Sequence, residues 1–233
     1  MAETTTLTWL GHAAFRLDTA SGKRIYVDPF LKGNPKCPEV EQTPERVDVI
    51  AVTHGHGDHV GDTAELAGRH GAKVVALVEL AGWLGKNGVD EALLNAPNKG
   101  GTVQVEGVRF TLTNAFHSGS APDGSYAGEP SGIVVRTDDG KTIYFAGDTC
   151  VFGDMQLIGR IYEPDIAVLP IGDHYTMGPK EAAVAAELVG AKRVVPCHWG
   201  TFGLLTGTPE QLEKLAPSGV TIEQLEPGDS VTV

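Results

Sequence analysis

The segment Thr53–His59, THGHGDH, constrains this chain more than any other feature. It places three histidines and one aspartate within seven residues, directly after the apolar run Val47–Val52. The pattern H-x-H-x-D-H is expected by chance in roughly one such chain in a thousand or fewer. Imidazole nitrogen and carboxylate oxygen are ligands of zinc, manganese and iron. The segment therefore predicts a metal site at the end of a strand, rather than a solvated polar loop.

Composition narrows the class of protein. The chain has 233 residues, of which 41% are apolar and 21% are charged, as expected for a soluble globular protein with a sizeable core. A net charge of −12 argues against nucleic acid as the main partner. It still allows a small anionic substrate, because a metal pair can dominate the local field. We therefore expect a small-molecule substrate.

The sequence also indicates a location in the cell. The N-terminal segment has no secretory signal, and no apolar run approaches the length of a membrane span. Three cysteines, an odd number, fit a reducing interior better than a disulfide framework. We expect a cytoplasmic protein that does not bind to membranes.

The order of elements predicts an α+β fold. Short strands are expected at Leu7–Leu10, Ala14–Leu17, Arg24–Val27, Val47–Val52, Lys73–Leu77, Val103–Val105 and Arg109–Phe116. The second half repeats the scheme, with strands at Gly132–Arg136, Thr142–Ala146, Ile166–Pro170 and Arg193–Pro196. Helices are expected at Asp62–His70, Pro179–Val189 and Thr208–Leu215, the last with Thr208 as N-cap. Two strand sets flanked by helices predict sheet packed on sheet, with the helices outside.

Polar residues of the same kind recur where the predicted strands end. These residues are Asp28, His117, Asp148 and His198. One such residue alone would be interpreted as a surface or capping residue. Strand ends at one edge of a sandwich lie close together, and loops at such edges carry functional sites. We therefore expect these side chains to lie near the histidine cluster.

Several motifs make the chain resemble the metallo-β-lactamase superfamily. They are TWLGHAAF (8–15), VDPFLKGNP (27–35), THGHGDHVGD (53–62), NAFHS (114–118), FAGDT (145–149), PIGDHYTMGPKEA (170–182) and PCHWGTF (196–202). Within the superfamily, the chain is similar to prokaryotic metal-dependent hydrolases related to ascorbate-6-phosphate lactonase. The resemblance implies a four-layered αβ/βα sandwich. It also implies one domain over residues 1–233, with two pseudo-repeated halves at roughly 1–117 and 118–233.

The resemblance implies a site for two divalent metal ions, with zinc favoured and manganese or iron as alternatives. One ion would be held by His54, His56 and His117, the other by Asp58, His59 and His198, and Asp148 would bridge the two. Metallo-β-lactamases with a cysteine ligand carry it at the position of Asp148. The carboxylate here therefore favours a general hydrolase of lactones, phosphoesters or thioesters over an antibiotic-degrading enzyme.

Two residues are expected to act in catalysis. Two metal ions can share a water and supply hydroxide at neutral pH. Asp58 would orient that hydroxide as well as bind metal. His174, in the segment 170–182, is the candidate hydrogen-bond donor to the substrate or acid for the leaving group. The competing interpretation of His174 is a residue that only caps the helix Pro179–Val189.

Less specific roles are assigned to the other residues near the predicted site. His12 either lines the pocket or supports a ligand, or it is a packed turn histidine. Asp28 is expected to fix a ligand histidine through a hydrogen bond, the alternative being a strand-end carboxylate that bonds only backbone amides. Alternation of side chains along the strand turns Cys197 away from the face of His198, so Cys197 is expected to be buried in the core. Cys150 is assigned no chemical role. The loops Ser118–Ser131 and Leu31–Arg46 are the expected walls of the pocket.

The favoured function is a dinuclear hydrolase of a small ester, lactone or phosphoester, using a metal-bridging hydroxide. One alternative is a metal-holding regulatory or binding protein without turnover. Another is an iron-dependent oxidoreductase on the same fold. Whether the chain forms a homo-oligomer stays open.

Overall fold

Two seven-stranded sheets form the centre of the computed structural model, which describes residues 4–233. The first sheet has the strand order β14–β1–β2–β3–β4–β5–β6. Its strands are β1 (Thr6–Trp9), β2 (Phe15–Asp18), β3 (Arg24–Val27), β4 (Val49–Val52), β5 (Lys73–Ala76), β6 (Leu94–Asn95) and β14 (Ser230–Thr232). Neighbours from β14 to β3 run antiparallel, and neighbours from β3 to β6 run parallel.

The second sheet has a matching arrangement, with the order β13–β12–β11–β10–β9–β8–β7. Its strands are β7 (Thr102–Val105), β8 (Val108–Asn114), β9 (Ser131–Arg136), β10 (Thr142–Phe145), β11 (Ile166–Pro170), β12 (Arg193–Cys197) and β13 (Thr221–Ile222). Neighbours from β7 to β10 run antiparallel, and neighbours from β10 to β13 run parallel. The chain changes sheet between β6 and β7, so this change does not coincide with the expected division near residue 117. The pseudo-repeat stays a prediction.

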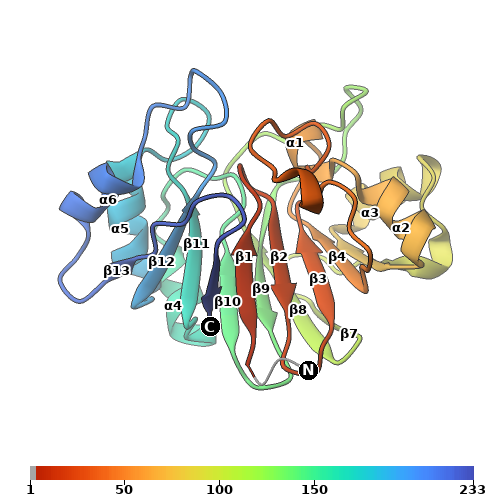
Figure 1. Cartoon of the computed structure of the whole chain (residues 1–233), viewed down its shortest axis with the longest axis horizontal. Helices are drawn as coiled ribbons and strands as arrows, with labels where there is room; N and C mark the ends of the chain where they lie inside the picture. The colour runs from red at the N-terminus through yellow and green to blue at the C-terminus, as the bar shows by residue number, and fades with distance from the viewer. Residues whose placement is uncertain (1–3) are drawn as a thin grey trace.

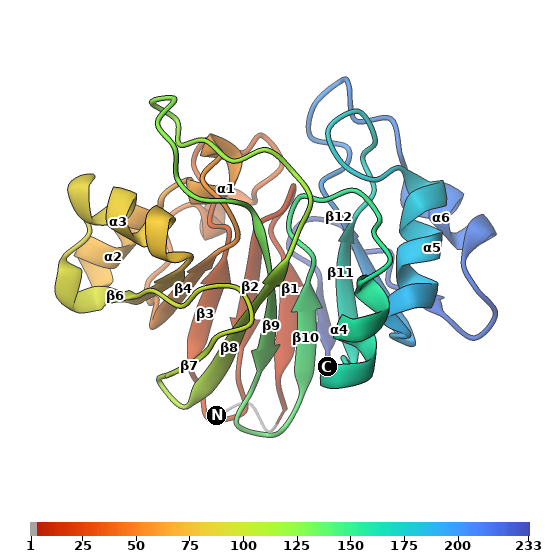
Figure 2. The ribbon, with the colours of Figure 1, turned by 180° about the vertical axis from the view of Figure 1, so that it is seen from behind.

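Helices flank the two sheets, and most of them lie along the outer faces. They are α1 (Gly57–Val60), α2 (Thr63–His70), α3 (Val78–Lys86), α4 (Met155–Tyr162), α5 (Pro179–Val189) and α6 (Pro209–Leu215), with short 3₁₀ turns at Glu39–Glu41 and Glu91–Leu93. Figure 1 shows α2 and α3 on the side of the first sheet and α4 to α6 on the side of the second, and Figure 2 shows the same layers from behind. The predicted four-layered αβ/βα sandwich is confirmed. Within residues 4–233, no helix combines the length and apolar character that crossing a membrane requires.

Apolar side chains fill the space between the layers. Between the sheets, the rings of Phe15 and Phe145 meet edge to face at 5.7 Å. On the outer side of the second sheet, α4 and α5 pack closely, because Gly159 has no side chain. A Cβ atom at Gly159 would lie 2.1 Å from the carbonyl oxygen of Val189. Close packing of this kind fixes the layers relative to one another, so the loops at the strand ends start from defined positions.

Elements with terminal signals in the sequence are where we predicted them. The predicted helix Pro179–Val189 agrees with α5 at both ends, because Pro179 suits the first turn and Gly190 ends it with φ of 68°. Thr208 is the N-cap of α6 and forms a capping box with Gln211. Helices α1, α3 and α4 were not predicted, and α1 is only a single turn long.

Candidate metal centre

The histidine cluster lies where β4 ends. His54 and His56 follow the strand, and the single turn of α1 carries Asp58 and His59. Gly55 lets this turn lie directly beneath the loop 118–131, because a Cβ atom there would lie 2.8 Å from the Cβ of Ala127. The sequence after β4 thus forms a tight turn that directs its polar side chains toward the sheet ends.

The other predicted ligands also follow strands. His117 comes after β8, Asp148 after β10 and His198 directly after β12. The backbone N–H of His198 donates to the carbonyl oxygen of His12 at 2.9 Å, and His198 has a left-handed φ of 54°. Gly172 permits this conformation, since a Cβ atom there would lie 2.0 Å from the carbonyl oxygen of His198. Close backbone packing therefore fixes the position of the backbone from which the His198 side chain projects.

One group of three imidazoles comes together at the outer side of the centre. His54, His56 and His117 offer ring nitrogens that all lie within 4.8 Å of one another. Nε2 of His54 and Nδ1 of His56 are 3.0 Å apart. These are the three residues expected to hold the first ion.

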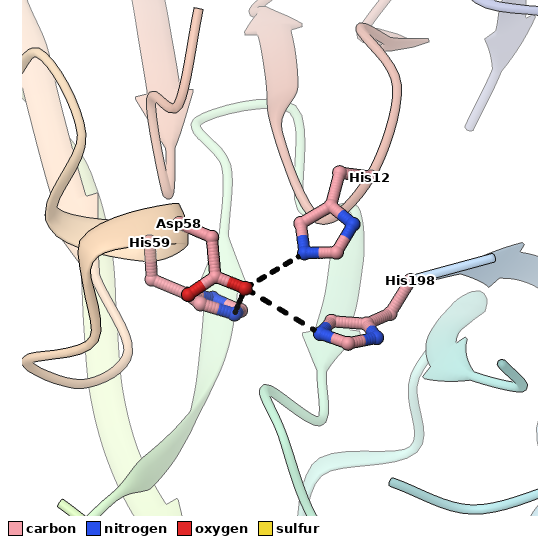
Figure 3. A group of neighbouring side chains, drawn as sticks. All are labelled: His12, Asp58, His59 and His198. Carbon is pink, nitrogen blue, oxygen red and sulfur yellow. Dashed lines mark hydrogen bonds and ion pairs between the residues drawn. The ribbon is translucent and has the colours of Figure 1, made fainter. Parts of the chain in front are cut away.

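A second group surrounds the carboxylate of Asp58, as Figure 3 shows. Oδ2 of Asp58 lies 3.9 Å from Nε2 of His59 and 3.8 Å from Nε2 of His198. Nε2 of His12 is closer, at 2.9 Å from the same oxygen. The three residues expected to hold the second ion are therefore adjacent, with His12 as an additional neighbour.

Asp148 lies between the two groups. Its Oδ2 atom is 3.6 Å from Nε2 of His117, 3.3 Å from Nε2 of His59 and 3.1 Å from Nε2 of His198. One oxygen thus reaches imidazoles of both expected ligand sets. This is the position that a bridging carboxylate requires.

The side chains fit bound metal ions. Ligand bonds of about 2.0–2.1 Å in tetrahedral geometry place ligand atoms about 3.3 Å apart, which is the spacing around Asp148. Buried Nε2 of His59 and Oδ1 of Asp148 have no hydrogen-bond partner among residues 4–233. Unpaired buried polar atoms are costly, and a cation between them removes that cost. The donor set of imidazoles and carboxylates suits zinc, manganese or iron.

Asp28 and His12 support the predicted ligands through hydrogen bonds. Buried Asp28 accepts from Thr53 and lies 2.8 Å from Nδ1 of His59, so it orients that imidazole as we expected. His12 is fully buried, and its Nδ1 lies 3.1 Å from Oγ1 of Thr201 while its Nε2 contacts Asp58. Of the two interpretations left open for His12, the geometry favours support of a ligand.

Burial and charge set the protonation of the site. Burial lowers the pKa of His54, His56 and His117, so these imidazoles stay neutral and keep a lone pair for metal. Burial raises the pKa of Asp148, but His59 and His198 outweigh burial and hold the pKa well below its usual range. Burial lowers the pKa of His59, yet Asp148 and Asp28 outweigh it and raise the pKa well above its usual value.

A cavity of about 810 Å³ opens over the centre. Its floor includes His56, Asp58, His117, Asp148 and His198, and its wall consists of Ser118, Tyr175, Phe202, Gly203 and Leu204. The loop Ser118–Ser131 contributes Ser118, as expected. The prediction that Leu31–Arg46 forms a second wall is wrong, because none of its residues lines the cavity within residues 4–233. That wall comes instead from the segment after His198.

The remaining predicted residues lie around this centre. His174 is exposed and lies against Tyr175, which lines the cavity, while His174 does not. The helix cap is Gly178, so the capping interpretation of His174 is wrong. Asp173 and His174 both have left-handed φ angles, of 65° and 57°. Cys197 is buried in the core, where burial raises the pKa of its thiol, and Cys150 is exposed.

Two features of the site were not apparent in the sequence. One is the contact of His12 with Asp58, which depends on the left-handed turn at His12, with φ of 55°. The other is the apolar wall formed by Phe202 and Leu204. Phe202 closes the PCHWGTF motif, and its position four residues after a predicted ligand was the available signal.

Comparisons with known proteins agree with the fold and with a metal-dependent protein. A model of the β-lactamase superfamily domain matches residues 23–199. The chain is 46% identical to a UPF0173 metal-dependent hydrolase of Koribacter versatilis, over 96% of both chains, and 47% identical to one of Herpetosiphon aurantiacus, over 98% of both. Among solved structures, Igni18, a metallo hydrolase of Ignicoccus hospitalis, has a TM-score of 0.85 at 34% identity, covering 99% of this chain and 98% of its own.

Replacing Asp28 by Asn should weaken metal binding. The substitution removes the carboxylate that faces Nδ1 of His59, and loss of such a partner costs about 10–100-fold in metal affinity. Competition of the protein with a zinc chelator measures this change. Asp48→Asn is the control, because Asp48 accepts a backbone N–H at the opposite end of β4. Equal affinities of the two variants would contradict the role of Asp28.

His12 should make the metal-free protein sensitive to acid. Burial lowers the pKa of His12 from 6.5 to about 4, against the opposing hydrogen bond to Asp58. As pH falls through this window, the unfolded chain takes up a proton that the folded protein does not, so stability is lost. Between these pH values, the free energy of unfolding of wild type should fall by up to about 3 kcal/mol more than that of His12→Gln. Chemical denaturation with a chelator present measures both curves, and parallel curves would contradict the account.

Proposed function

The chain belongs to the metallo-β-lactamase superfamily and, within it, to the family of UPF0173 metal-dependent hydrolases, and we propose that it is a dinuclear hydrolase. The proposed substrate is a small ester, lactone or phosphoester. The observation that carries this proposal is the position of Oδ2 of Asp148, within 3.6 Å of imidazoles from both expected ligand sets.

The proposed ligands divide as the sequence suggested. His54, His56 and His117 would hold one ion, Asp58, His59 and His198 would hold the other, and Asp148 would contact both. Zinc is the favoured metal, with manganese and iron as alternatives. When bound, such a pair would supply hydroxide at neutral pH and Lewis-acid polarisation of the substrate oxygen.

Asp58 has the proposed role of orienting the attacking water. Its carboxylate is about one-third exposed, at 32%, and it faces the cavity while His12 holds Oδ2 from behind at 2.9 Å. Burial raises the pKa of Asp58, but the His12 hydrogen bond and His59 outweigh burial, so the carboxylate stays ionised. An ionised, oriented carboxylate can accept a hydrogen bond from water and later take up its proton.

The same arrangement bears on the alternative functions. A protein that only holds metal has little need for a carboxylate that is held rigidly at the floor of an open cavity. This observation supports hydrolysis over a purely regulatory or binding role. An iron-dependent oxidoreductase would share the donor set, so metal content and a substrate screen are the measurements that separate the two.

Asp58→Ala should abolish hydrolysis. After reconstitution with zinc or manganese, wild type is screened on esters, lactones, phosphodiesters and phosphate monoesters. The variant should lose about a hundredfold or more in turnover of whichever substrate reacts, because it lacks the group that orients water. Glu65→Gln, on the exposed face of α2, is the control. A protein that holds only iron and hydrolyses nothing in the screen would contradict the proposal, as would equal rates of wild type and Asp58→Ala.

His174 remains the proposed donor to the substrate or leaving group, and its neighbour Tyr175 provides a matched comparison. If His174 donates, His174→Ala lowers kcat by about a hundredfold or more and leaves metal content unchanged. Tyr175→Phe, which removes only a hydroxyl group, should then stay near wild type. The opposite result would assign the donor to Tyr175 and overturn the role of His174.

A further inference from the structure

The cavity over the metal centre has a polar floor and an apolar wall. Tyr175, Phe202 and Leu204 form the wall and are 53%, 43% and 53% exposed, respectively. Covering large apolar side chains that face solvent in a cavity with an apolar group is favourable, because it removes apolar surface from water. The wall therefore favours a ligand that carries an apolar portion beside its reactive group.

Contacts beneath the wall fix its position relative to Asp58. The ring of Phe202 packs edge to face on buried His12, with 5.2 Å between ring centroids. The same His12 contacts Asp58 at 2.9 Å through Nε2 and Thr201 at 3.1 Å through Nδ1. Only the His12 ring separates Phe202 from Asp58, so an apolar group bound on Phe202 lies close to the carboxylate proposed to orient water. The reactive carbon and the apolar portion of the substrate must accordingly be close together.

The charges around the cavity argue against a phosphate monoester. No lysine or arginine is among the cavity's lining residues, as far as residues 4–233 show. The basic residues Lys32, Lys36 and Arg46 of the segment before the histidine cluster do not line the cavity. Lys32 and Arg46 form ion pairs with Glu65 and Asp48. A doubly charged phosphate group is normally held by such cations or by a helix N-terminus.

From these observations we propose that the substrate is a neutral carboxylic ester whose apolar group lies on Tyr175, Phe202 and Leu204. This inference rests on the proposed hydrolase function and narrows its substrate class. In the reaction, the oxygen of water bonds to the acyl carbon and the bond from that carbon to the alcohol oxygen breaks. One proton of the water goes to the departing alcohol, and the products are a carboxylic acid and an alcohol.

A series of p-nitrophenyl esters tests the inference. With the zinc- or manganese-reconstituted protein, kcat/KM should rise about twofold for each methylene added from acetate to butyrate to hexanoate, since each covers more of a half-exposed wall. p-Nitrophenyl phosphate should react at least about a hundredfold more slowly than the hexanoate ester. Phe202→Ala and Leu204→Ala should each lower the ratio of kcat/KM for the hexanoate ester to kcat/KM for the acetate ester toward one, because each removes part of the wall. Leu215→Ala is the matched control, because Leu215 is 51% exposed on α6 and lies outside this cavity.

The outcomes separate this inference from the proposed function. Hydrolysis with no dependence on chain length, or with preference for the phosphate monoester, overturns the ester inference and leaves the hydrolase intact. A chain-length effect lost equally in Leu215→Ala, or lost together with a change in oligomeric state, also overturns it. If no ester reacts, ligand-observed NMR of ethyl hexanoate with the metal-free protein decides. Binding that disappears in Phe202→Ala supports the apolar site, and absence of binding to wild type rejects it.

Discussion

The buried carboxylate of Asp148 is the constraint on which the rest of the site depends. It has almost no contact with solvent, and one of its oxygens faces three imidazoles while the other has no partner among residues 4–233. A buried carboxylate is costly unless positive charge lies close to it. In the metal-free protein His59 supplies that charge, because Asp148 and Asp28 raise its pKa, and bound divalent ions would supply it in its place. The fold thus places an ionised carboxylate where bound metal ions would balance its charge.

The scaffold achieves this by joining loops from both sheets. Each sheet contributes polar residues after its strands, and Asp28 connects the end of β3 to Thr53 and His59. His12 has a similar role across the site, because its ring contacts Asp58 and Phe202 and its carbonyl oxygen accepts the N–H of His198. One turn of the chain thereby sets the positions of a proposed metal ligand (His198), the proposed catalytic carboxylate (Asp58) and the apolar wall of the cavity.

Much of this could be predicted from sequence, and the exceptions have physical causes. The apolar run before Thr53 and the Pro and Gly at the ends of α5 are local signals, so β4 and α5 were predicted well. Strand β14 is three residues long and pairs with β1 from the other end of the chain, which no local pattern encodes. The contact of His12 with Asp58 and the wall at Phe202 arise from left-handed turns and long-range packing. The composition of Leu31–Arg46 wrongly suggested a wall of the cavity, because composition does not encode which loops pack beside the site.

The central claim is that these side chains hold two ions on either side of Asp148. Anomalous diffraction from crystals of the zinc-reconstituted protein tests it most directly. The account predicts two peaks about 3.5–4 Å apart, with the carboxylate of Asp148 between them. A single peak, or peaks away from His54, His59 and Asp148, would contradict it.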